Sequence, residues 1–151
     1  MSKSAKGTYT PRNPEKLFNP NKEITFRSSW EFAAFRMCDN HPSIIKWGSE
    51  NIQIPYRNPL TNKWTVYIPD LLMVYESKSG LRASMIEIKP AKEVPGYLSE
   101  SKNGGKPVRY SAKDKAAHIV NTAKWDAAKK FCGKRGIEFR VITEFELFGK
   151  K

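Results

Sequence analysis

Residues 67–90, YIPDLLMVYESKSGLRASMIEIKP, decide the fold of this chain of 151 residues. Two apolar runs flank the polar insert 76–80, whose Ser, Lys and Gly content is typical of a turn. The stretch therefore predicts a β-hairpin. Its runs are mostly fit for burial, and three charged residues stand out in them: Asp70, Glu87 and Lys89.

One antiparallel register brings these three residues together. Opposing Asp70 and Glu87 centres the turn between Lys78 and Ser79, inside the polar insert. Lys89 lies two residues beyond Glu87 and therefore on the same face. The remainder of both faces is apolar, which predicts a hairpin that is central in its sheet and covered on both sides. The first face carries Leu72, Val74, Ala83 and Met85, and the second carries Leu71, Met73, Tyr75, Ile86 and Ile88.

Two carboxylates and an amine at one end of a buried hairpin favour a bound cation. Directly opposed residues have Cβ atoms about 5 Å apart. Two carboxylates at that distance repel by roughly 3 kcal/mol at an effective dielectric constant of about 20. A proton on one of them, or a cation between them, removes the repulsion. Magnesium takes one or two carboxylates together with waters and substrate phosphates. The hypothesis is a metal site that cleaves phosphodiesters, with Lys89 holding a phosphate oxygen or orienting a water.

A surface salt bridge is the alternative explanation of these residues. The pattern Glu-x-Lys also occurs at residues 76–78 and 100–102, both in polar sequence where solvated pairs are expected. The apolar flanks of Glu87 and its register with Pro69-Asp70 favour the metal site.

The composition favours a polyanion as the partner. The 27 Lys and Arg residues against 15 Asp and Glu give a net charge of +12, and the pI is near 9.8. Nucleic acid is the first expectation and an anionic membrane the second, but no amphipathic anchor or long apolar run supports a membrane. The N-terminus lacks the apolar core of a signal peptide. Cys38 and Cys132 lie in expected helices without metal-binding spacing, which favours free thiols in a reducing compartment.

The N-terminal part of the chain predicts an arm and a helix. Residues 1–27 are rich in Lys, Asn and Pro, so we expect an extended basic arm, either a flexible tail or, less favoured, a segment that docks on DNA or a partner protein. A helix should begin at Ser28 or Ser29 and end near Asn40, before Pro42. Ser28 and Glu31 match a capping box; Glu31 is either only a cap or a third carboxylate facing the metal. The expected buried stripe is Trp30, Ala33, Ala34, Met37 and Cys38.

The rest of the chain predicts further strands, a loop and a long helix. Short strands are expected at 44–47 and 52–56, and a strand at 63–69 leads into the hairpin. Residues 91–110 form a loop that we interpret as a mobile flap over the substrate path, with disorder without function as the alternative. A helix follows from about Ala112 to Gly133, then a strand at 137–143 and a C-terminal tail at 145–151. The expected buried stripe of the helix is Ala112, Ala116, Ile119, Ala123, Ala127 and Phe131.

A histidine nuclease is a weak alternative. His41 would need partner histidines, and His118 is the only other one in the chain.

The motifs and the element order resemble the PD-(D/E)XK nuclease superfamily. Pro69-Asp70 and residues 87–89 carry the resemblance, with Glu31 in the preceding helix. The YxPD strand, the E-x-K-P strand and the G-x-x-F…T-E segment at 136–144 resemble the TnsA-type transposon endonucleases, over about residues 28–144. The resemblance implies a single α/β domain of the restriction-endonuclease type. Its central mixed sheet would be flanked by helices in the order α-β-β-β-α-β.

The resemblance also implies roles for individual residues. Asp70, Glu87 and the Ile88 carbonyl would hold Mg²⁺ or Mn²⁺, and Glu31 would support the metal or its water. Lys89 would position the attacking water or help to deprotonate it. Asn121 and Lys124 on the long helix would approach the scissile phosphate. The other expected DNA-binding residues are Arg109, Lys113, Lys129 and Lys130. The alternative is that the lysines of the helix only form a solvated basic face.

The whole chain further resembles the head completion nucleases of T-even-type tailed phages. This implies double-stranded DNA as substrate, cut or trimmed when the filled head is prepared for tail attachment. It also implies portal or neck proteins as partners, and a location in the host cytoplasm during assembly or on the virion. Neither a membrane nor a small-molecule cofactor is expected. The competing hypotheses are a non-catalytic DNA-binding virion protein on a nuclease-like scaffold and, more weakly, an RNA-binding basic module.

Overall fold

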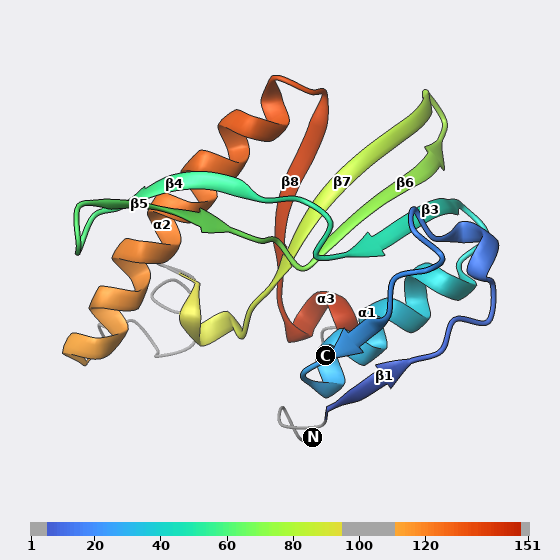
Figure 1. Ribbon diagram of the computed structural model, residues 1–151, viewed down its shortest axis with the longest axis horizontal. Coiled ribbons are helices and arrows are strands. Elements are labelled where there is room, and N and C mark those ends of the chain that lie inside the picture. Colours follow the sequence, from blue (N-terminus) through green and yellow to red (C-terminus); the bar gives the residue numbers. More distant parts are fainter. Residues whose placement is uncertain (1–5, 95–110, 149–151) are drawn as a thin grey trace.

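The computed structural model describes residues 6–94 and 111–148, which form a mixed sheet with helices on both faces (Figure 1). None of the helices in these residues is long and apolar enough to cross a membrane. In chain order the elements are β1 (Gly7–Tyr9), the 3₁₀ turn η1 (Pro14–Lys16), β2 (Ile24–Phe26), α1 (Ser29–Asn40), β3 (Ile44–Ser49), β4 (Ile54–Asn58), β5 (Lys63–Tyr67), β6 (Leu71–Ser77), β7 (Gly80–Ile88), the 3₁₀ turn η2 (Ala91–Glu93), α2 (Ala112–Gly133), β8 (Ile137–Ile142) and α3 (Glu144–Phe148).

The central sheet has the strand order β3-β6-β7-β8, with the expected hairpin β6–β7 in the middle. The first three strands are antiparallel and β8 runs parallel to β7, so the sheet is mixed as the sequence predicted. Leu71 lies opposite Ile86, and Ser77 lies opposite Gly80 at the turn. This is the register that opposes Asp70 and Glu87. Gly80 has φ +110°, a conformation that favours glycine, and the turn is therefore placed where the sequence put it.

The two faces of the hairpin enter different cores, which confirms the prediction that both are covered. Leu71 and Ile86 are buried in a core beneath α1 and the N-terminal segment. Met85 is buried in a second core with α2 and the β4–β5 hairpin, and Leu72 packs against it. The helices on the two sides therefore fix the hairpin, and with it the acidic end, from both faces.

Helix α1 has the expected bounds, but its buried face differs from the predicted stripe. The Ser28 hydroxyl accepts a hydrogen bond from the Glu31 N–H at 3.1 Å, whereas the Glu31 carboxylate accepts from the Arg27 N–H and not from Ser28, so only half of the capping box forms. Met37 is 37% exposed. The buried residues are Ala34, Phe35, Cys38 and Asp39.

The flexible-tail interpretation of residues 1–27 is wrong for the described residues 6–27. The buried carboxylate of Asp39 accepts hydrogen bonds from the Tyr9 hydroxyl at 2.6 Å and from the N–H groups of Arg12 and Asn13 at 2.6 and 2.9 Å. Burial alone would raise the pKa of Asp39, but these hydrogen bonds outweigh it and the pKa lies below its ordinary value. The buried carboxylate of Asp39 therefore anchors the N-terminal segment, and a prediction based on apolar residues alone could not identify it.

The connection between α1 and α2 holds five strands, as expected from the short strands at 44–47, 52–56 and 63–69 together with the central hairpin, whereas the order α-β-β-β-α-β implied by the family resemblance counts three. Strands β4 and β5 form a separate antiparallel ladder, in which Ile54 lies opposite Tyr67. Figure 1 shows this hairpin crossing α2. Its inner residues Ile54 and Tyr56 are buried in the core that includes residues of α2, so this hairpin packs on the helix and does not pair with the central sheet.

Helix α2 spans the predicted residues, but its buried stripe is offset from the expected one. Ile119 is 48% exposed. The alanine spacing misled the prediction because the largest buried side chain, Trp125, falls outside that spacing. The buried residues are Asn121, Trp125, Ala128 and Cys132.

The expected C-terminal tail contains the short helix α3. Gly136, with φ +68°, reverses the chain from α2 into β8. Of the expected flap at 91–110, residues 91–93 form η2, and residues 95–110 lie outside the described part of the chain.

Candidate metal and nuclease site

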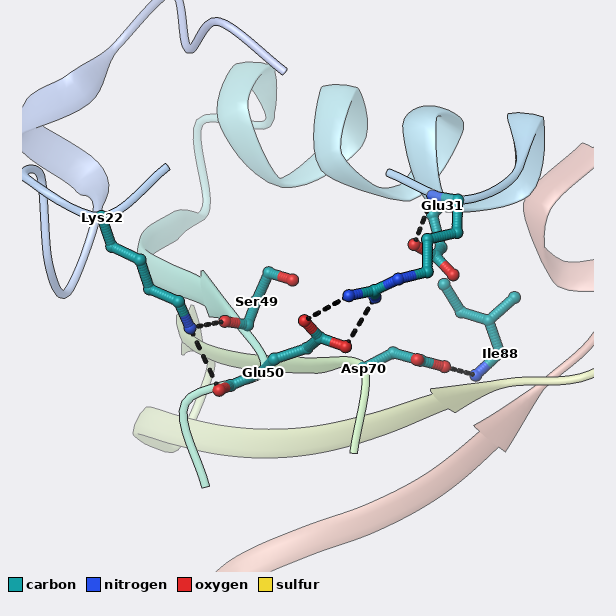
Figure 2. Close-up of polar contacts among 7 residues, drawn as sticks. Lys22, Glu31, Ser49, Glu50, Asp70 and Ile88 are labelled. Atoms are coloured by element: carbon teal, nitrogen blue, oxygen red, sulfur yellow. Dashed lines mark hydrogen bonds and ion pairs between the residues drawn. The ribbon is translucent and has the colours of Figure 1, made fainter. Parts of the chain in front are cut away.

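The acidic end of the central hairpin lies where β6 begins and β7 ends. Asp70 immediately precedes β6 and is held by the end of the opposing strand: its Oδ2 accepts a hydrogen bond from the Ile88 N–H at 2.7 Å (Figure 2). Its backbone carbonyl accepts from the Glu50 N–H at 3.1 Å. Both contacts use backbone donors, so the position of the Asp70 carboxylate is fixed by the fold and not by flexible side chains.

Glu87 is the second acid of the site and is only 7% exposed. Its Oε1 accepts a hydrogen bond from the Tyr67 hydroxyl at 2.6 Å. Tyr67 ends β5, three residues before Asp70, and is itself buried. The Tyr67–Glu87 contact was not predicted, although Tyr67 belongs to the YxPD motif that carried the family resemblance.

Lys89 places its amine beside this acid pair. Its Nζ lies 3.8 Å from Glu87 Oε2 and 4.0 Å from Glu93 Oε1, and its side chain is 25% exposed. The Lys89 N–H donates to the Ile142 carbonyl at 3.0 Å, which extends the pairing of β7 with β8. The backbone is thus held while the amine keeps access to solvent, as a group that contacts an incoming phosphate or water requires.

Burial raises the pKa values of both carboxylates and so disfavours their ionised forms. Desolvation, and next the Glu87 charge, raise the pKa of Asp70 to about 8. Desolvation also raises the pKa of Glu87, against the Tyr67 hydrogen bond and the charges of Lys89 and Lys124. Such a pair gains from any cation that enters between its members.

The donor set fits a hard divalent cation. In the part of the chain that the structure describes, no three His, Cys, Asp or Glu side chains gather to hold a metal. Magnesium does not need such a cluster, because one or two carboxylates with waters and phosphate oxygens complete its shell. Asp70 and Glu87 supply two carboxylates, and Asp70 has a second oxygen, Oδ1, besides the one bound to Ile88. The Ile88 carbonyl as a further ligand stays a prediction.

Glu31 approaches the acid pair from α1, on the other side of the site. Figure 2 shows it on α1 above Asp70. Its Oε1 accepts from the Arg27 N–H at 3.0 Å. The main cause of the raised pKa values of Asp70 and Glu87 is burial, and the Glu31 charge is a smaller cause that also raises both. It is near enough to act on them through its charge, and its role as support for a metal or its water stays a prediction.

Arg27 and Glu50 join the N-terminal segment to the same region and were not predicted. Arg27 Nη1 lies 2.7 Å from Glu50 Oε2. Lys22 Nζ donates to the backbone carbonyls of Ser49 and Glu50 at 2.7 and 3.1 Å (Figure 2). No local sequence pattern marks these contacts, since their partners are more than 20 residues apart.

Of the residues expected to bind DNA, Lys124 is the one that acts on the acids through its charge. Lys124 Nζ lies 5.7 Å from the centroid of the Tyr67 ring, and its charge acts on Glu87. Asn121 is on the same helix and buried. The other predicted positions on α2 are exposed, and Arg109 lies outside the described residues; the α2 positions are Lys113, Lys129 and Lys130.

The family model described as the N-terminal domain of TnsA-like endonucleases matches residues 41–144, which is more than half of the chain. This chain belongs to the TnsA-like endonuclease family. The match starts at His41, so it includes the hairpin with Asp70, Glu87 and Lys89 and excludes α1 with Glu31. The restriction-endonuclease-like α/β fold expected from the sequence agrees with this family.

A curated relative extends the similarity to most of the chain. The head completion nuclease of Enterobacteria phage T4 is 37% identical over 138 residues, covering 91% of this chain and 90% of the relative. The aligned region is long enough to include more than the family model matches. The TnsA-like chain described here is therefore similar to a phage nuclease over nearly its whole length.

Proposed function

We propose that this TnsA-like chain hydrolyses the phosphodiester bonds of DNA with Mg²⁺ or Mn²⁺ held by Asp70 and Glu87. The observation that carries the proposal is that the half-buried Asp70 and the buried Glu87 are opposed where β6 begins and β7 ends, with the Lys89 amine 3.8 Å from Glu87. A divalent ion bound there would lower the pKa of a water and offset charge on the phosphate.

The chain's own groups account for the remaining tasks. Lys89 positions the attacking water or a phosphate oxygen, because its amine lies beside Glu87 and its side chain is 25% exposed. Tyr67 holds the Glu87 carboxylate through its hydroxyl. Lys124 and Asn121 face the incoming strand from α2. Glu31 supports the metal or its water from α1, through its charge.

We further propose that the DNA is packaged phage DNA, cut or trimmed as the filled head is prepared for tail attachment. The relative named a head completion nuclease supports this, as does the net charge of +12, which favours binding to a DNA backbone. Portal or neck proteins are the partners expected for that step, with the host cytoplasm during assembly as the location.

Plasmid nicking by the purified protein tests the proposal. We expect nicking in Mg²⁺ or Mn²⁺, none in EDTA, and a loss of at least about 100-fold in Lys89→Ala, since loss of about 3 kcal/mol of transition-state stabilisation has that effect. Lys78→Ala in the β6–β7 turn is the matched control and should nick like the unchanged protein. Full nicking in EDTA would refute the metal-dependent reaction, and full nicking by the Lys89→Ala protein would refute the role of Lys89. No nicking with either metal would favour the non-catalytic virion protein instead.

A further inference from the structure

A groove of about 450 Å³ lies between the β4–β5 hairpin and the C-terminal half of α2, away from the acid pair. Its lining combines aromatic and basic side chains with one acid, Asp126. The site described above uses none of them except Lys130, an expected DNA contact. The aromatic residues are Tyr56, Trp64 and Phe131, and the basic ones are Lys130, Lys134 and Arg135.

Trp64 is the feature of this groove that burial in the fold does not explain. Its side chain is 72% exposed, more than any other large apolar side chain in the described residues. Arg57, also exposed, lies directly opposite Trp64 in the β4–β5 ladder, so the Cβ atoms of the two residues are about 5 Å apart. The exposed indole therefore offers a flat surface with an arginine as its cross-strand neighbour.

The helix side of the groove carries a second planar cation. The Arg135 guanidinium carbon lies 3.6 Å from the centroid of the Phe131 ring. Its Nη1 also donates to the Phe131 carbonyl at 2.9 Å, which holds the guanidinium in place. The stacked Arg135–Phe131 pair therefore presents a fixed planar surface, with Lys130 and Lys134 beside it.

We propose that this groove binds single-stranded DNA, with a base stacked on Trp64 and phosphates held by Lys130 and Lys134. That the polymer is DNA rests on the proposed function. Aromatic platforms within a basic channel are how proteins hold single strands without sequence preference. The bases of a duplex already stack on one another, so duplex DNA offers Trp64 no free face, whereas a frayed or resected end does.

Two elements join the groove to the acid pair. The same hairpin that carries Trp64 ends at Tyr67, which contacts Glu87. Along α2, Lys124 lies six residues before Lys130, a rise of about 9 Å, so the same helix carries both the groove and the lysine whose charge acts on Glu87. A single-stranded end seated in the groove would therefore run from the site and keep the substrate in register for cutting.

Fluorescence anisotropy in EDTA tests this without cleavage. The probes are a labelled oligo-dT and a duplex of equal length closed by hairpins at both ends. We expect Trp64→Ala to weaken oligo-dT binding at least fivefold, since stacking contributes about 1–3 kcal/mol per base, with less than twofold change for the duplex and an unchanged salt slope. Trp64→Phe should retain most of the affinity. Lys134→Ala should lower the salt slope by about 0.7.

Leu81→Ala is the matched control, because Leu81 is 66% exposed but lies at the β6–β7 turn. Binding of oligo-dT by Trp64→Ala within twofold of the unchanged protein, or an equal loss for the closed duplex, would overturn the inference; the first result would make the exposed Trp64 face a protein-docking surface instead. Because these titrations contain EDTA, a protein that binds as expected but never nicks plasmid refutes the proposed function and leaves this inference standing.

Discussion

Replacing Asp70 by Asn should make the metal-free protein more stable while removing its response to metal. The change keeps the shape of the side chain, and the amide oxygen can still accept the hydrogen bond from the Ile88 N–H, 2.7 Å from Oδ2. It removes a charge that is costly to bury beside Glu87. A residue placed for metal binding and not for stability should behave in this way.

The magnitude follows from the raised pKa of Asp70. Its value moves from 3.8 to about 8, and each unit corresponds to about 1.4 kcal/mol. A folded pKa above the unfolded one contributes stability that is full below about pH 4 and is lost as the pH rises through about 8. The full shift corresponds to about 6 kcal/mol. Water access to the half-buried Asp70 and burial of the Asn amide together offset most of it, which leaves about 2 kcal/mol at pH 9 and a rise in Tm of about 5 °C.

Thermal unfolding in EDTA at about pH 5 and pH 9 measures this effect. Asp70→Asn should change Tm little at the lower pH and raise it at the higher, and Mg²⁺ should then stabilise only the unchanged protein. Asp126→Asn, which removes an exposed carboxylate from α2, is the control and should stay within about 0.5 kcal/mol at both values. An Asp70→Asn protein that is less stable at pH 9, or that still gains stability from Mg²⁺, would refute the reasoning.

Three other substitutions test the surroundings of the acids. Tyr67→Phe removes the hydroxyl that donates to Glu87, so the pKa of Glu87 should rise further. The acidic limb of the pH–rate profile for nicking should then move to higher pH, with about a tenfold loss of activity at neutral pH. An acidic limb at the same pH as in the unchanged protein would contradict this. Asp39→Ala leaves the Tyr9 hydroxyl and two backbone N–H groups without their acceptor; it should cost about 3 kcal/mol in urea unfolding and open the N-terminal segment to trypsin, whereas unchanged digestion would show that other contacts hold the segment. Glu31→Gln keeps an acceptor at the start of α1 but removes its charge; nicking should fall about tenfold at unchanged Tm, and full activity would reduce Glu31 to a helix cap.

The central hairpin could be predicted because its sequence carries two agreeing signals. The polar turn and the alternation of apolar residues both fix the register that opposes Asp70 and Glu87, and a one-residue slip would expose one face of the hairpin. The bounds of α2 followed from its composition and from Gly136 beyond its end. These signals are local, so no knowledge of the rest of the fold was needed.

The features that sequence reasoning missed depend on contacts between distant segments. Asp39 is buried in α1 because residues 9–13 supply its donors, about 27 positions earlier. The β4–β5 hairpin forms its own ladder because α2, which follows much later in the chain, covers its inner face. The sequence placed Tyr67 in the strand before the hairpin, but it could not predict the contact with Glu87, because that contact depends on how β5 and β7 are placed relative to each other in the fold.

The most direct test compares plasmid cleavage by Glu87→Gln and Glu76→Gln proteins across a Mg²⁺ titration, with DNA binding measured in EDTA; Glu76 is exposed near the β6–β7 turn and serves as the control. We predict that Glu87→Gln loses at least about 100-fold in cleavage at every Mg²⁺ concentration while binding DNA as the unchanged protein does, and that Glu76→Gln loses neither. Cleavage by Glu87→Gln at the rate of Glu76→Gln would contradict the claim that the paired acids of the central hairpin hold the catalytic metal.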